Sequence, residues 1–169
     1  TLSSSSAASD VYKRQARSRR RCVAPGIEWL DCQSPVMEPA QLRTLPQTDQ
    51  VTRHICVEGW SAIGKWGGVP FSYFLRRVGA DLSAKYVGFK CADDYFTSID
   101  MPTALHPQTL MALTYDGEQL PPRYGFPMKL RMPTKLGYKN PKHIQAIFVT
   151  NTYPGGYWED QGYNWFGGS

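Results

Sequence analysis

The stretch Arg53-His54-Ile55-Cys56-Val57-Glu58-Gly59-Trp60-Ser61 alternates polar and apolar residues. Successive side chains of an extended strand point to opposite faces, so a strand here, expected over 51–57, would direct His54, Cys56 and Glu58 to one face and Ile55 and Val57 to the other. A thiol between an imidazole and a carboxylate, with Arg53 near enough to favour the thiolate, could bind metal or attack a substrate. The alternative is a structural cysteine, because free cysteine is among the most buried residue types.

Charge is unevenly distributed along the 169 residues. Residues 1–21 hold six of the 19 basic residues and one of the 14 acidic ones, which accounts for the whole net charge of +5. The remainder is balanced, which argues against nucleic acid as a partner. No run of about 18 apolar residues occurs, so the sequence predicts no transmembrane segment.

The chain divides into two parts by composition. Residues 1–21 are rich in serine and alanine, then basic, and predict a disordered segment of adapter-derived or linker origin. Residues 22–169 have the length of one domain. We therefore expect the chain to be a fragment whose natural N-terminus is missing.

The sequence contains four cysteines, and their spacing is not that of a metal-binding motif. Cys22, Cys32, Cys56 and Cys91 form no C-x-x-C pair, which argues against a zinc site.

The hydrophobic patterns predict a mixed, β-rich α+β fold. Phe71, Phe74, Leu75 and Val78 form a helical stripe over 70–78, and Gly79 ends it. A shorter helix is expected over 38–45, with its two leucines inward. The glycine-rich segment 64–69 predicts a loop. Strands are expected near 51–57, 85–91, 110–115, 128–132 and 144–149.

Polar residues outside these elements favour structural roles. Asp93 and Asp94 follow the strand over 85–91, and adjacent carboxylates are more typical of turn capping than of an acid–base pair. His106 is expected in a loop, and the aromatic tail over 155–166 is expected to pack over the domain or line a cleft.

A window from Gln119 to Tyr157 contains no acidic residue. Its cations are Arg123, Lys129, Arg131, Lys135, Lys139 and Lys142. Such a cluster repels itself unless an anion binds, and phosphate held by Lys, Arg and backbone N–H groups fits this pattern. A solvated basic face is the alternative.

Four motifs occur in order: Cys56-Val57-Glu58-Gly59-Trp60-Ser61, Gly67-Gly68-Val69-Pro70, Leu105-His106-Pro107-Gln108-Thr109 and Lys135-Leu136-Gly137-Tyr138-Lys139. Together they resemble the molybdopterin-binding oxidoreductase domain of the sulfite oxidase family, over about residues 51–150. The branch of periplasmic protein-methionine-sulfoxide reductase catalytic subunits is most similar. The residues after Cys56 do not match the sulfite-oxidising branch, so sulfite oxidation is kept only as an alternative.

This resemblance implies a Mo-molybdopterin cofactor with Cys56 as the thiolate ligand of molybdenum. Glu58 would either support that ligand from beside the metal site or take part in proton transfer to the substrate. Cofactor contacts are implied for six further residues, namely Cys91, Tyr124, Lys129, Asn140, Pro141 and Lys142. The first three stand where the family has Thr, Asn and Arg, and the last three fall on its pterin phosphate loop.

The implied activity is two-electron oxygen-atom transfer on a small or protein-bound S-oxide or N-oxide. The family also implies a periplasmic location and a membrane haem protein as electron-transfer partner. Two other hypotheses stay open. One is a non-catalytic anion-binding module, and the other is a thiol enzyme that uses Cys56 with His54.

Overall fold

The computed structural model describes residue 37 and residues 39–169, so Cys22, Cys32 and the expected disordered segment lie outside it. Its elements are α2 (Pro39–Arg43), β1 (Thr48–Ile55), β2 (Ser61–Pro70), α3 (Phe71–Arg77), β3 (Tyr86–Cys91), β4 (Phe96–Asp100), α4 (Met101–Leu105), β5 (Leu110–Tyr115), β6 (Glu118–Gln119), β7 (Lys129–Arg131) and β8 (Ile144–Thr150), with 3₁₀ turns η1 (Pro122–Tyr124), η2 (Gly137–Lys139) and η3 (Glu159–Gln161). The β-rich α+β expectation is confirmed. No helix in this part of the chain is long and apolar enough to cross a membrane.

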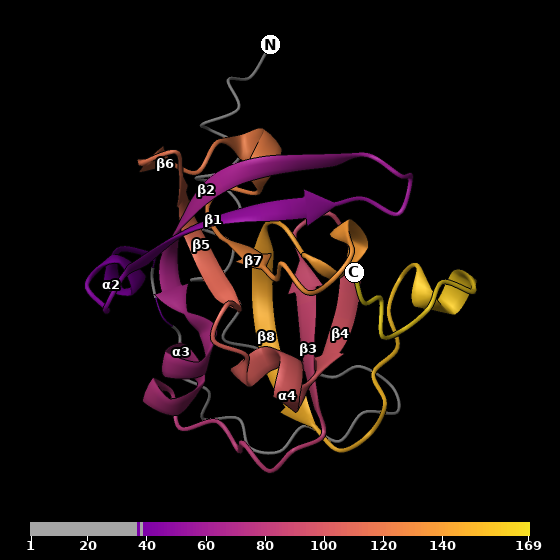
Figure 1. Cartoon of the computed structure of the whole chain (residues 1–169). Helices are drawn as coiled ribbons and strands as arrows, with labels where there is room; N and C mark the ends of the chain where they lie inside the picture. The colour runs from indigo at the N-terminus through magenta and orange to yellow at the C-terminus, as the bar shows by residue number, and fades with distance from the viewer. Residues whose placement is uncertain (1–36, 38) are drawn as a thin grey trace.

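The strands form two antiparallel sheets (Figure 1). The first has the order β1-β2-β5-β6, and β7 pairs with β5 on the same sheet. The second has the order β4-β3-β8. Leu113 of β5, Leu130 of β7 and Phe89 of β3 are at most 1% exposed and belong to one core cluster. Burial of large apolar side chains from both sheets is the main stabilising term of the fold.

Helices α2 and α3 form where the apolar pattern predicts them. Leu42 of α2 is 2% exposed, and Phe71 and Leu75 of α3 are buried in the same core. Pro70 is the N-cap of α3 rather than its first residue. Gly79 has a φ of +71°, a conformation that favours glycine and ends the helix.

The expected loop over 64–69 is wrong, because these residues belong to the ten-residue strand β2. The glycines serve strand packing there. A Cβ atom on Gly68 would lie 2.0 Å from the Met111 carbonyl oxygen, so only glycine lets β2 approach β5 at the bulge between Gly67 and Gly68. Strand β4 and helix α4 were also not predicted.

The polar segments between elements have the expected structural roles. Asp93 Oδ1 accepts a hydrogen bond from Tyr95 N at 3.4 Å in the β3–β4 turn, as turn capping requires. His106 is the C-cap of α4, and its Nδ1 accepts from Gln108 N at 3.2 Å.

The aromatic tail packs beside β4, as expected (Figure 1). Trp165 Nε1 donates to Ser98 Oγ at 3.0 Å, and Ser98 Oγ donates to the Gly155 carbonyl at 2.6 Å. Tyr157 N donates to the Phe96 carbonyl at 2.9 Å. These contacts attach residues 153–169, which we call the C-terminal strap, to the second sheet.

Candidate active site

Cys56 lies in the tight turn that joins β1 to β2. Its N–H donates to the Trp60 carbonyl at 2.9 Å, and its carbonyl accepts from Gly59 N at 3.1 Å. Gly59 has a φ of +93°, which suits glycine in a hairpin turn. The strand expected over 51–57 therefore ends at Ile55, and Cys56 is presented half-buried at a tip instead of on a strand face.

The turn, and not strand alternation, brings Glu58 to the thiol. Glu58 Oε2 lies 3.7 Å from Cys56 Sγ and accepts a hydrogen bond from Trp60 Nε1 at 3.1 Å. The Trp60 ring is 51% exposed and lies 5.8 Å from the His54 ring. Arg53 belongs to the other strand face, where its Nε donates to Ser61 Oγ at 3.1 Å.

Two cations of the basic window enter the interior from β7. Lys129 is 7% exposed and Arg131 is fully buried, while Leu130 between them packs into the apolar core, as the expected alternation requires. The Lys129 Nζ lies 5.4 Å from the Trp66 ring centroid, and the Arg131 Cζ lies 5.8 Å from it. A β-bridge places Lys142 beside Lys129. The solvated-face alternative fails for Lys129 and Arg131.

These three cations have no ion-pair partner among the carboxylates of residues 39–169. We call Lys129, Arg131 and Lys142 the cation cluster. Burial, with the charges of Lys142 and Arg131, lowers the pKa of Lys129 to about 7. Burial lowers the pKa of Arg131 to about 10. Charges buried without counter-ions are costly, so an anion at this position would be favoured.

His54 projects toward the same cluster. Burial and the three cations lower its pKa to about 4, so the imidazole is neutral at physiological pH. A Cβ atom on Gly137 would lie 3.0 Å from His54 Nε2, so η2 packs closely against this ring. In the sequence, the feature that could have placed His54 at this site is its alternation with Gln50 and Thr52, which puts all three side chains on one face of β1.

Six buried side-chain polar atoms in the described part of the chain have no hydrogen-bond partner; one is Glu159 Oε2 of the C-terminal strap, and the other five mark the face of the hairpin that carries His54. These five are Gln50 Oε1, Thr52 Oγ1, His54 Nδ1, Trp66 Nε1 and Arg131 Nε. Gln50, Thr52 and His54 alternate along β1, and Trp66 pairs directly with Gln50 across the hairpin. Native proteins satisfy nearly all such groups, so this set fits a polar ligand that supplies donors and acceptors.

Two of the three remaining cations of the window are ion-paired, and the third, Arg123, is exposed. Lys139 Nζ forms a buried ion pair with Glu159, and Lys135 Nζ lies 3.9 Å from Asp100. Both carboxylates come from outside the acid-free window, so linear sequence could not reveal them. The expectation of a bound anion therefore applies to the cation cluster and not to the whole window.

The loop after η2 contributes two of the predicted residues. Asn140 is 4% exposed, and its Oδ1 accepts from Arg131 Nη1 at 3.1 Å and from Met132 N at 2.7 Å. Pro141 is buried, and its carbonyl accepts from Leu130 N at 3.0 Å.

Tyr124 and Cys91, the other two predicted residues, lie outside this loop. The Tyr124 ring packs 6.0 Å from Trp66, at the edge of the cation cluster. Cys91 ends β3 inside the apolar core, where burial and Asp93 raise the pKa of its thiol to about 12. At this pKa the thiol is protonated at neutral pH.

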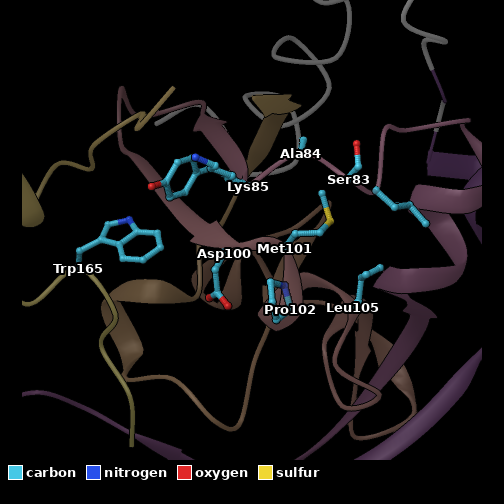
Figure 2. A pocket seen from close by; sticks show the side chains of 10 residues that line it. Ser83, Ala84, Lys85, Asp100, Met101, Pro102, Leu105 and Trp165 are labelled. Carbon is cyan, nitrogen blue, oxygen red and sulfur yellow. The ribbon is translucent and has the colours of Figure 1, made fainter. Parts of the chain in front are cut away.

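A cavity of about 550 Å³ lies elsewhere, at the Tyr86 end of β3. Figure 2 shows Trp165 on one side of it, with Asp100, Met101, Pro102 and Leu105 on the other. Its lining is mostly apolar and contains neither thiol nor imidazole. The cavity is therefore separate from the site around Cys56.

Comparison with known proteins identifies the family of this chain. The chain belongs to the family of oxidoreductase molybdopterin-binding domains, which matches residues 30–158. It is therefore a domain of the molybdopterin-dependent oxidoreductase class.

Individual relatives refine this class. A putative protein-methionine-sulfoxide reductase subunit of Azospira oryzae, named YedZ1, is 84% identical over 129 residues, which cover 76% of this chain and 49% of the relative. The protein-methionine-sulfoxide reductase catalytic subunit MsrP of Xanthomonas axonopodis is 34% identical over 154 residues, covering 82% of this chain and 45% of that protein. The chain thus spans about half the length of these curated relatives.

A solved structure shares the fold. The sulfane dehydrogenase SoxCD from Paracoccus pantotrophus superposes with a TM-score of 0.62 at 19% sequence identity, over 67% of this chain and 34% of that chain. At this identity the likeness concerns the fold alone.

Proposed function

We propose that this chain binds Mo-molybdopterin and catalyses the two-electron reduction of S-oxides, with protein-bound methionine sulfoxide as the substrate. The observation that carries the proposal is a half-buried thiol, Cys56, at the tip of the hairpin whose inner face carries unpaired polar atoms beside the cation cluster, in which Lys129 and Arg131 are buried and Lys142 is exposed. The names of the relatives from Azospira and Xanthomonas support this substrate.

The residues present fit this cofactor. The cation cluster supplies charge-assisted donors for the pterin phosphate, and the unpaired atoms of Gln50, Thr52 and Trp66 can hydrogen-bond polar edges of a ring system. Cys56 is a soft sulfur ligand at a partly open position, as a molybdenum ligand requires. Cys91, with its buried, protonated thiol, would only pack beneath the site. When bound, the cofactor supplies the two-electron redox couple and an acceptor for the oxygen atom of the substrate.

Glu58 is the proposed proton carrier. Reduction of an S-oxide to a thioether consumes two electrons and two protons and releases water. The nearest carboxylate oxygen to the thiol is Glu58 Oε2, which Trp60 Nε1 holds at 3.1 Å. When Cys56 is a thiolate it no longer donates to Oε2, which leaves that atom free to carry a proton toward the substrate oxygen. The exposed Trp60 ring offers an aromatic surface for a sulfur-containing side chain.

The electrons would come from a partner. Resemblance to the periplasmic reductase branch points to a membrane haem protein as the donor and to the periplasm as the location. Both are proposals for the whole protein, because this chain covers only about half the length of each of these curated relatives.

Elemental analysis of protein made in a host that synthesises the cofactor tests the proposal. We expect about one molybdenum per chain in the unmodified protein, as one thiolate ligand per site implies. Cys56→Ala should lose the metal and the reduction of methionine sulfoxide, whereas Cys91→Ala should keep both. Metal content and activity that survive Cys56→Ala would refute the assignment of the ligand.

A non-catalytic anion-binding module is the second candidate, favoured by the cation cluster alone. It predicts sulfate binding without molybdenum. A thiol enzyme would instead turn over without molybdenum and would lose activity when iodoacetamide alkylates Cys56.

A further inference from the structure

Residues 159–169 of the C-terminal strap contact the segment 133–140, which we call the site loop. Leu136 N donates to the Gly167 carbonyl at 2.8 Å, and Ser169 N donates to the Thr134 carbonyl at 3.2 Å. Lys135 Nζ donates to the Phe166 carbonyl at 2.8 Å. In Figure 1 the strap lies at one side of the second sheet, next to β4. The strap thereby connects the site loop to that sheet.

One contact in this interface is a buried ion pair. Lys139 is fully buried, Glu159 is 9% exposed, and Lys139 Nζ donates to Glu159 Oε1. Thr97 Oγ1, from β4, donates to the same carboxylate oxygen at 2.7 Å. The carboxylate of the strap therefore ties η2 of the site loop to β4.

The site loop in turn orients the groups of the candidate active site. Asn140, the residue after Lys139, accepts hydrogen bonds from Arg131 Nη1 and Met132 N. Arg131 Nη2 donates to the Arg53 carbonyl at 2.6 Å, three residues before Cys56. Gly137 of the same loop packs against His54. A continuous chain of contacts thus runs from Glu159 through Lys139 and Asn140 to the cation cluster.

We propose that the Lys139–Glu159 pair is a positioning unit through which the C-terminal strap sets the geometry of the anion site. The proposal rests on the anion-binding part of the proposed function. It assigns a role to strap residues that do not touch the cation cluster themselves. Removal of one partner leaves the other charge buried and unpaired, so the site loop has to move to solvate it.

Positioning and simple electrostatics predict opposite effects of Glu159→Gln. The substitution removes a negative charge near the cation cluster, so electrostatics alone would strengthen anion binding. Displacement of the site loop would weaken it, by about tenfold on the usual scale of coupling between sites. Glu159→Asp keeps the charge and shortens the side chain, so electrostatics predicts no change whereas positioning predicts a smaller loss.

The experiment measures sulfate binding to the full chain by isothermal titration calorimetry at pH 6, where Lys129 is charged. Sulfate is a tetrahedral dianion whose charge is constant near this pH. Asp160→Asn is the matched control, because it removes an exposed carboxylate from the adjacent position of the strap and should change affinity by less than about twofold. Affinity that is equal or tighter in Glu159→Gln overturns the proposal.

Amide hydrogen exchange of residues 136–140 gives a readout without any anion. Faster exchange in Glu159→Asp at these amides, with β3 and β5 unchanged, supports positioning. Unchanged exchange there overturns it. If the unmodified chain binds neither sulfate nor molybdenum, the proposed function fails by itself, while the exchange data still decide the role of the strap.

Discussion

Asn140→Ala should remove the side-chain hydrogen bonds that hold Arg131 of the cation cluster against the site loop. The Asn140 side chain is 4% exposed and makes two accepting contacts, from Arg131 Nη1 and Met132 N. It also donates to the Leu136 carbonyl at 3.0 Å and to the Lys135 carbonyl at 3.4 Å. Alanine leaves the donors Arg131 Nη1 and Met132 N buried without partners. At about 1–3 kcal/mol for each orphaned donor, the free energy of unfolding should fall by about 2–6 kcal/mol.

Urea denaturation followed by tryptophan fluorescence and far-UV circular dichroism measures this loss. The control is Asn151→Ala, at an exposed asparagine whose Oδ1 accepts one hydrogen bond, from Lys85 N at 3.0 Å. It should cost about 0.5–1.5 kcal/mol. Asn140→Asp should recover part of the stability, because its carboxylate still accepts from Arg131, yet it should abolish sulfate binding by neutralising that cation. A loss for Asn140→Ala no larger than the control's would refute the reasoning.

Four further predictions follow from charge, strand packing and burial. Sulfate affinity should fall as pH rises from 6 to 8, because Lys129 with its pKa of about 7 becomes neutral, and Lys129→Met should flatten the profile; a flat profile in the unmodified chain contradicts this. In the absence of anion, thermal unfolding should show the opposite trend, since between pH 7 and 10.5 the unfolded chain binds the Lys129 proton and the folded chain does not, so stability rises with pH. Gly68→Ala should prevent proper pairing of β2 with β5 and lower the melting temperature sharply, whereas Gly168→Ala, whose Cβ would meet only the side chain of Phe166 at 3.1 Å, should shift it little. Leu113→Ala should cost about 2–5 kcal/mol by cavity formation in urea unfolding, and Val57→Ala, at an exposed position, less than about 0.5 kcal/mol.

Local sequence patterns predicted one helix and four strands correctly. Helix α3 and strands β3, β5, β7 and β8 all lie within one or two residues of their expected bounds. Their local signals are an apolar stripe with helical spacing in α3, alternation in β7, and short apolar runs rich in strand-forming residues in β3, β5 and β8. The strand β2 was missed because its glycines are typical of loops, and they are needed only where another strand approaches.

The amino-acid sequence by itself was enough to single out Cys56 as the candidate thiol, to predict that Lys129 and Arg131 share one face of β7, and to identify the ordered motifs of the family. These depend on residue type and on spacing along one element. Tertiary structure decided which cations keep a counter-charge, since Glu159 and Asp100 reach Lys139 and Lys135 from distant segments. It also decided that His54, Trp66 and Arg131 come together from the three strands β1, β2 and β7, because hydrogen bonds and charges are satisfied in space and not along the chain.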